Sequence, residues 1–177
     1  MEETIKNLKK LILREQFVNC YSQKFSPENR STVEQFLSSL KAIHKNVIYI
    51  DINGLLFEQC EDEEQEANLL LKLIGKEWDA KGLGEMNLKT ISIADALYKW
   101  SNILDTDKKV LLVFHLLRYP YSEKEKNLLR SLRKTIRNAD KMSRYLGILI
   151  ISNRAVSHWE LFPESNLDDR HVAILEC

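Results

Sequence analysis

Val47-Ile48-Tyr49-Ile50-Asp51 is a short run of mostly β-branched and aromatic residues, bounded by Asn46 on one side and by Asn53-Gly54 on the other. Such a run between turn-forming residues is typical of a strand that is buried on both faces of a sheet. Strands of that kind are usually parallel to their neighbours and covered by helices. This stretch therefore predicts the core of an α/β domain, and it requires further strands and covering helices elsewhere in the chain.

Helical and strand patterns alternate on both sides of this strand. Apolar residues recur at helical spacing in several segments, and other apolar runs have the length of strands. The predicted helices are Thr4 to Leu13, Ser26 to His44, Ala67 to Trp78, Ser92 to Leu104 and Glu123 to Tyr145, and the other predicted strands are Gln16 to Tyr21, Val110 to Phe114, Gly147 to Ser152 and Val172 to Leu175. Gly82 and Gly84 should end the third helix. The alternation predicts a single domain over residues 1–177, a three-layer α/β sandwich with a mostly parallel five-stranded sheet.

Length and composition are those of an ordinary globular domain. The chain has 177 residues, of which 44% are hydrophobic and 29% charged, and its formal net charge is +0. A neutral chain is not drawn as a whole to nucleic acid or to an anionic membrane, and no apolar run reaches the roughly 18 residues of a spanning helix. The three cysteines, Cys20, Cys60 and Cys177, are an odd number without a secretory signal ahead of them. We therefore expect a reduced, cytoplasmic protein without membrane contact, in which Cys20 is buried and inert.

The segment between the first predicted strand and the next helix has the position of a phosphate-binding loop without its residues. Such a loop reads G-x-x-x-x-G-K-[ST]. In this sequence Lys24 and Asn29 stand at the glycine positions. Arg30 stands at the lysine position, and Ser31 alone agrees with the motif. Pro27 removes a backbone donor and fixes φ, so the segment is expected to begin a helix, capped by the residue before it, rather than to wrap a phosphate.

The order of the elements resembles the P-loop ATPase fold in its AAA+ or STAND form over nearly the whole chain. In that family the Walker B strand ends in an aspartate that helps to hold Mg²⁺, often followed by a catalytic glutamate, but His115 and Leu116 stand there in this sequence. Asn153 follows the strand at the sensor-1 position, and Arg170 stands where such ATPases often carry an arginine before their fifth strand. We expect no helical lid, because the chain stops after that strand. The resemblance implies a degenerate nucleotide site without cofactor, metal or ATP hydrolysis, formed by Lys24, Asn29, Arg30, Ser31, His115, Asn153 and Arg170.

Two charged segments are candidate interaction surfaces. From Arg118 to Arg144 there are nine basic and three acidic residues. Six basic residues share one face of the predicted helix and are called the basic stripe: Arg130, Arg133, Lys134, Arg137, Lys141 and Arg144. This stripe suits a nucleic-acid backbone or an acidic protein surface, but a solvated helix face has the same pattern. From Glu58 to Glu66 there are six carboxylates and no basic residue, which fits a basic partner, a second copy of the chain, or only the favourable helix macrodipole.

Three functions remain open from the sequence. The favoured one is a non-catalytic pseudo-ATPase-like module that binds a partner protein, and the family resemblance implies a larger NTPase or a bacterial defence or signalling complex as that partner. The second is a nucleic-acid-binding accessory protein of RecA-like fold that acts through the basic stripe. The third is an enzyme of unrecognised type that works through His115, Asn153 and Arg30, although a satisfied histidine at the end of a buried strand is the commoner case.

Overall fold

The structure is a computed structural model that describes residues 2–14, 17–25, 29–52, 59–83, 92, 95, 98–99, 102–104, 107–116, 146–153 and 172–176. These residues include five strands and three helices with defined bounds. None of the helices in this part of the chain is both long enough and apolar enough to cross a bilayer.

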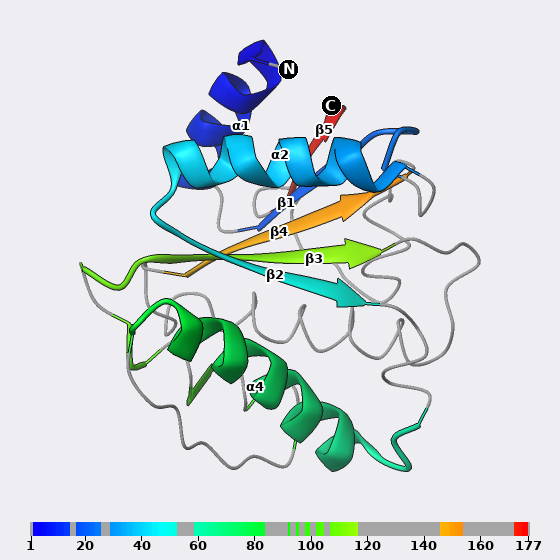
Figure 1. Ribbon diagram of the computed structural model, residues 1–177, viewed down its shortest axis with the longest axis vertical. Coiled ribbons are helices and arrows are strands. Elements are labelled where there is room, and N and C mark those ends of the chain that lie inside the picture. Colours follow the sequence, from blue (N-terminus) through cyan, green and yellow to red (C-terminus); the bar gives the residue numbers. More distant parts are fainter. Residues whose placement is uncertain are drawn as a thin grey trace.

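The centre of the molecule is a parallel sheet (Figure 1). Its strands are β1 Phe17–Tyr21, β2 Asn46–Ile52, β3 Val110–Leu116, β4 Leu146–Ser152 and β5 Val172–Glu176. They lie in the order β2-β3-β4-β1-β5, and all four neighbouring pairs are parallel. The predicted fold class, an α/β domain with a mostly parallel five-stranded sheet, is confirmed.

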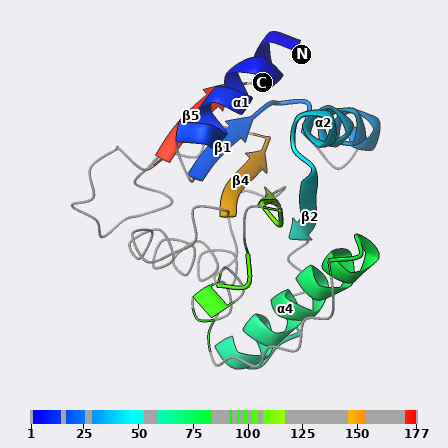
Figure 2. The ribbon, with the colours of Figure 1, turned by 90° about the vertical axis from the view of Figure 1, so that its left-hand side faces the viewer.

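Helices cover both faces of this sheet. In Figure 1, α1 (Glu2–Arg14) and α2 (Arg30–Ile43) lie on one side and α4 (Glu63–Ala80) lies on the other, and Figure 2 shows β2 between α2 and α4. The apolar stripes predicted from the sequence are buried: Ile5 and Leu8 of α1, Val33, Phe36, Leu37 and Leu40 of α2, and Ala67, Leu70, Leu71, Ile74 and Trp78 of α4. Burial of apolar surface stabilises such contacts by about 25 cal/mol per Å². Packing of these stripes, more than intrinsic helix propensity, therefore holds the helices in place.

The ends of α4 follow local capping chemistry. At its start, Asp62 Oδ1 accepts a hydrogen bond of 2.8 Å from the backbone N–H of Gln65. The side-chain oxygen of Gln65 in turn accepts one of 3.0 Å from the N–H of Glu61. After the helix, Gly82 has a φ of 66°, a left-handed conformation that glycine adopts without strain and that commonly ends helices. The predicted stop at this glycine is confirmed.

The start of α2 differs from the prediction. The α-helix begins at Arg30 with Asn29 as its N-cap residue, and it ends at Ile43 with His44 as its C-cap residue, within one residue of the predicted end. The expected start at Ser26-Pro27 lies outside the described residues. The Asn29 side chain makes no capping hydrogen bond, so the first turn of α2 is held by its packing rather than by its cap.

The face of the sheet beneath α1 and α2 carries a row of chemically mixed side chains. Register aligns Asp51, His115, Ile151 and Cys20 across β2, β3, β4 and β1. The last two belong to one buried cluster with apolar side chains of α1 and α2. The row therefore places an aspartate and a histidine at the margin of an apolar core, close to the carboxyl ends of the strands.

The cysteines depart from the predicted reduced state. Cys20 is fully buried on β1, as predicted. Its sulfur, however, is disulfide-bonded. Cys60 is not part of a disulfide and is half-buried ahead of α4. The expectation of an inert, buried thiol at Cys20 is therefore wrong in this structure, because that sulfur is oxidised.

Candidate functional site

The candidate site lies where the carboxyl ends of the parallel strands meet, which is where sheets of this kind bind ligands. The chain between Ser22 and Asn29 joins β1 to α2 at this edge, and His115 lies one residue before the end of β3. Six residues predicted from the sequence lie along this edge: Lys24, Asn29, Arg30, Ser31, His115 and Asn153. The seventh, Arg170, lies outside the described residues.

The loop after β1 turns back on itself. Ser22 continues the ladder to β4, because its N–H donates to the Ser152 carbonyl at 3.0 Å. The N–H of Phe25 then donates to the Ser22 carbonyl at 2.9 Å, and the N–H of Lys24 donates to Ser22 Oγ at 3.3 Å. A phosphate-binding loop needs consecutive N–H groups that point outward. Two N–H groups of this loop are instead used inside the loop.

An aromatic side chain anchors the same loop from below. Phe25 is only 2% exposed and belongs to the core cluster beneath α2. Its ring centroid lies 5.0 Å from that of Phe36, with an interplanar angle of 56°, which is a favourable tilted arrangement. No sequence pattern predicted this contact, since an isolated phenylalanine among polar loop residues has no periodicity. The buried ring of Phe25 thus anchors the loop to the core.

The start of α2 presents polar side chains to solvent. Asn29, Arg30 and Ser31 are exposed, as is Lys24 on the loop. The Arg30 guanidinium, at the first helical position, is therefore open to solvent. These four predicted residues therefore form an open surface.

His115 is the most enclosed polar side chain of the predicted set. It is 3% exposed, and its Nδ1 lies 2.7 Å from the hydroxyl oxygen of Tyr49 on the neighbouring strand. Its Nε2 is buried without a hydrogen-bond partner in the described part of the chain. Burial lowers the pKa of His115, and the charge of Asp51 and the nearby backbone of Phe25 partly offset that effect. The neutral imidazole is therefore the favoured form at neutral pH.

Tyr49 and Asp51 belong to the site although sequence reasoning did not select them. Burial raises the pKa of Tyr49, the charge of Asp51 raises it further, and the charge of Arg30 lowers it. Asp51 itself is exposed and is the register partner of His115. The sequence did contain a signal for these two residues. Tyr49 and Asp51 are alternate residues of the β2 run, so they lie on one face of the sheet, and this is the face of His115 once β2 pairs with β3.

The side chains of this site are better suited to hydrogen bonding and proton exchange than to metal binding. The Tyr49–His115 pair joins two titratable groups beneath the loop. In the residues with described positions, no three His, Cys, Asp or Glu side chains are grouped as ligands of a metal ion. Mg²⁺ prefers several oxygen ligands in octahedral geometry, and the end of β3 supplies an imidazole.

The structure describes most of the acidic segment but none of the basic stripe. The basic stripe, Arg130, Arg133, Lys134, Arg137, Lys141 and Arg144, lies outside the described residues, so its role as a nucleic-acid or protein surface stays a prediction. In the acidic segment, Glu61, Asp62, Glu63 and Glu64 are exposed at the start of α4, whereas Glu66 is 4% exposed. The acidic surface is therefore smaller than the sequence run, and Asp62 has a capping role in it.

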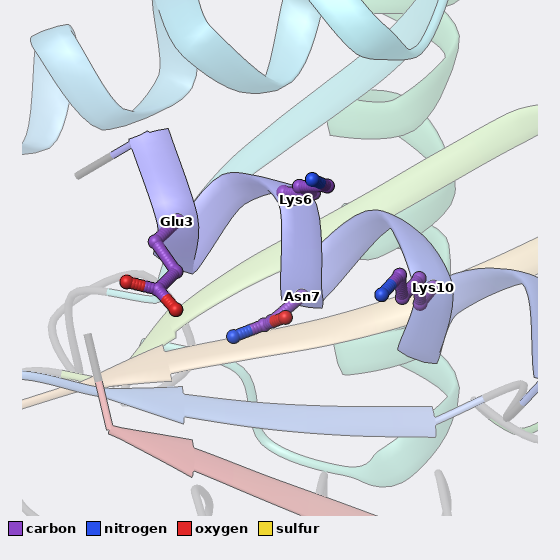
Figure 3. Close-up of a pocket in the computed structure, with 4 residues that line it drawn as sticks. All are labelled: Glu3, Lys6, Asn7 and Lys10. Atoms are coloured by element: carbon purple, nitrogen blue, oxygen red, sulfur yellow. The ribbon is translucent and has the colours of Figure 1, made fainter.

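A hollow of about 590 Å³ lies along α1 (Figure 3). Its described lining consists of Glu3, Lys6, Asn7 and Lys10, all of which are exposed. Glu3 and Asn7 extend from one side of the helix and Lys6 from the other. These side chains do not converge on a point, and they carry both signs of charge. They have the character of an ordinary solvated helix face.

Comparison with known proteins supports the fold. The sequence matches no protein-family model and no curated protein. A chain in the structure of Drosophila ORC bound to GC-rich DNA and Cdc6 aligns with a TM-score of 0.56 and 10% identity, over 99% of this chain and 28% of that chain. The Cdc6p crystal structure from Pyrobaculum aerophilum aligns with a TM-score of 0.50 and 13% identity, over 98% of this chain and 44% of that one.

The fold is P-loop NTPase-like. These two structures support the predicted P-loop NTPase-like fold. The chain spans less than half the length of either of them, and at such low identity the likeness concerns the fold alone. The chemistry of this chain has to be argued from its own residues.

Proposed function

We propose that this chain is a non-catalytic, pseudo-ATPase-like interaction module that binds a partner protein. The observation that carries the proposal is the closed loop after β1, in which Phe25 is buried and two backbone N–H groups donate to Ser22. When the ligand loop of such a scaffold is closed, its outer surfaces remain available for binding a partner.

The loop argues against phosphate binding for a geometric reason. The N–H groups of Lys24 and Phe25 could reach a phosphate only if they left Ser22 and if the Phe25 ring left its contact with Phe36. Full exposure of a buried phenylalanine costs about 1.5–3 kcal/mol, before any cost of the lost hydrogen bonds. Nucleotide binding would have to exceed these terms without the glycines that permit the required curvature.

The end of β3 argues against hydrolysis. A P-loop ATPase needs a carboxylate to help hold Mg²⁺ and a group that orients water. His115 is buried, hydrogen-bonded to Tyr49, and kept neutral by burial, so it is poorly placed for either task. Asp51 is a carboxylate on the adjacent strand, but it is exposed, and in the described part of the chain it belongs to no group of three possible metal ligands.

The partner is proposed to be a protein, of the class of larger NTPases or of a defence or signalling complex. Support comes from the similar structures, which show ORC bound to Cdc6 and DNA, so a domain of this fold does work within assemblies. The net charge of +0 argues against general affinity for nucleic acid. A second copy of this chain is a further partner of the same chemical class.

Nucleotide binding is tested by thermal unfolding with ATP, ADP or GTP at millimolar concentration, with and without Mg²⁺. A ligand at 100 times its Kd stabilises the native state by about 2.7 kcal/mol, so even weak binding would raise the midpoint. We expect no shift. Matched variants are Arg30→Ala and Lys41→Ala, which remove an exposed cation from the first and last turns of α2. A shift that persists in Lys41→Ala and disappears in Arg30→Ala would overturn the proposal.

Partner binding is tested by reconstitution with purified proteins. A protein captured with the tagged chain is purified and mixed with it, and the complex is measured by light scattering with and without ATP. We expect the complex to form equally in both conditions. A complex that requires ATP bound to this chain, or ATPase activity that this chain alone supplies, would contradict a non-catalytic role.

A further inference from the structure

We propose that Cys20 and Cys177 form a reversible disulfide that fastens β5 to β1, and that reduction of this bond frees β5 to leave the edge of the sheet. The inference goes beyond the proposed function, because it concerns a covalent bond within the fold and holds whether or not a partner is bound.

The number of cysteines identifies the two ends of the bond. The sulfur of Cys20 is disulfide-bonded. The chain has two other cysteines, Cys60 and Cys177, and Cys60 is not part of a disulfide. Cys177 lies outside the described residues, but its position in the sequence directly follows β5. Within a single chain it is therefore the partner that we assign to Cys20.

The register between β1 and β5 supports this assignment. Cys20 is aligned with Leu175, and Tyr21 is aligned with Glu176. The Tyr21 hydroxyl also donates a hydrogen bond of 3.3 Å to Glu176 Oε2. Leu175 packs against the buried cluster that contains Cys20, so these two side chains share one face of the sheet. Because side chains alternate between the faces of a strand, the alternation predicts that position 177 returns to the face of Cys20.

The bond matters because β5 is an edge strand of five residues. Among the described strands β1 is its one neighbour, whereas β1 also pairs with β4. A covalent bond between the carboxyl ends keeps β5 beside β1 even when the hydrogen bonds between the two strands break. Without that bond β5 can leave, and the outer edge of β1 becomes open to a strand of another protein.

The redox step is a thiol–disulfide exchange. One thiolate of a small dithiol, such as dithiothreitol, attacks a sulfur of the bond and forms a mixed disulfide. The second thiolate of the reductant then displaces the protein sulfur and closes a cyclic disulfide. The reductant loses two electrons and two protons, and the thiols of Cys20 and Cys177 gain them. A small disulfide, such as oxidised glutathione, drives the reverse reaction.

The bond is mapped first, by mass spectrometry of peptides from the full chain after oxidation with glutathione disulfide and digestion in acid without reductant. We expect a linked peptide pair that contains Cys20 and Cys177 and that dithiothreitol separates. A Cys20–Cys60 pair, or a Cys20 thiol that remains reduced, would overturn the assignment.

The release of β5 is measured by hydrogen exchange of backbone amides with and without dithiothreitol. Disulfides commonly stabilise the structure that they close enough to suppress opening by about 30-fold. We therefore expect the amides of β5 to exchange about 30-fold faster after reduction, whereas those of β3, which lies between β2 and β4, should not change.

Cys177→Ser and Cys60→Ser are the matched variants. Cys177→Ser breaks the bond but leaves the Cys20 side chain in the core, where it is fully buried, so its β5 amides should exchange fast with or without dithiothreitol. Cys60→Ser should behave as the wild type. Equal exchange of β5 in the oxidised and reduced chains, or a response to dithiothreitol that persists in Cys177→Ser, would refute the role of the bond. Neither result bears on nucleotide binding, so a failure here leaves the proposed function intact.

Discussion

Replacement of Phe25 by alanine is the most direct test of the closed loop. The ring is 2% exposed and lies 5.0 Å from the ring of Phe36. Truncation of a buried phenylalanine costs about 3–5 kcal/mol, and about 0.5–1.5 kcal/mol of such a cost is specific to an aromatic pair. We therefore expect Phe25→Ala to lower the free energy of unfolding by about 3 kcal/mol, toward the lower end of the range, because a loop can relax around the missing ring.

The assay is urea unfolding followed by circular dichroism, with Phe36→Ala and the double variant measured in the same way. The double-mutant cycle should give a coupling of about 0.5–1.5 kcal/mol between the two rings. Gln23→Ala is the matched control, because Gln23 is exposed on the same loop, and its effect should stay within about 0.5 kcal/mol. If Phe25→Ala costs no more than Gln23→Ala, Phe25 is not part of the core, and the loop is free to adopt the shape that holds a phosphate.

Three further predictions concern stability. Tyr49→Phe removes the hydroxyl that lies 2.7 Å from His115 Nδ1. This change should lower the free energy of unfolding in urea by about 1–3 kcal/mol, because a buried nitrogen loses its partner. An unchanged midpoint would mean that water replaces the hydroxyl. The free energy of unfolding should fall as pH drops below 6.5, because burial lowers the pKa values of His44 and His115 below their unfolded value of 6.5. Below that pH the unfolded chain binds more protons than the folded chain. The slope should be at most about 1.4 kcal/mol per pH unit for each histidine. The variant that lacks both histidines should lose most of this slope, and a slope that persists would assign it to carboxylates. Asp62→Ala removes the cap of α4 and should cost about 1 kcal/mol, whereas Asp62→Asn should restore most of that stability; equal losses in both variants would point to charge rather than capping.

The sequence predicts the described strands and helices of this fold well, since each of them has a strong local pattern. The β-branched run Val47 to Asp51 and the apolar spacing from Ala67 to Trp78 appear in the structure as β2 and α4. The order of the strands could not be read in the same way. A near-continuous apolar run indicates that a strand is buried on both faces, but it carries no information about which strand lies beside it.

The candidate site was predictable only in part for the same reason. The position of His115 at the carboxyl edge follows from the length of its strand and the polarity of what comes next. Its partner Tyr49 depends on the register between β2 and β3, which a single strand does not specify. The burial of Phe25 depends on the path of a loop, where neither periodicity nor capping applies. Local rules therefore located the edge, and pairing between distant segments determined its chemistry.

The strand order also constrains how the chain reaches this structure. β1 lies between β4 and β5, so its neighbours in the sheet are the last two of the described strands along the sequence. β2, β3 and β4 can pair one after another as they emerge, whereas Phe17–Tyr21 must wait for partners from the other end of the chain. Pairings of such long range slow folding and leave strand edges open to wrong partners. The loop that carries Phe25 follows β1 directly, so the edge of the sheet acquires its native form in one of the last steps of folding, when β1 enters the gap between β4 and β5.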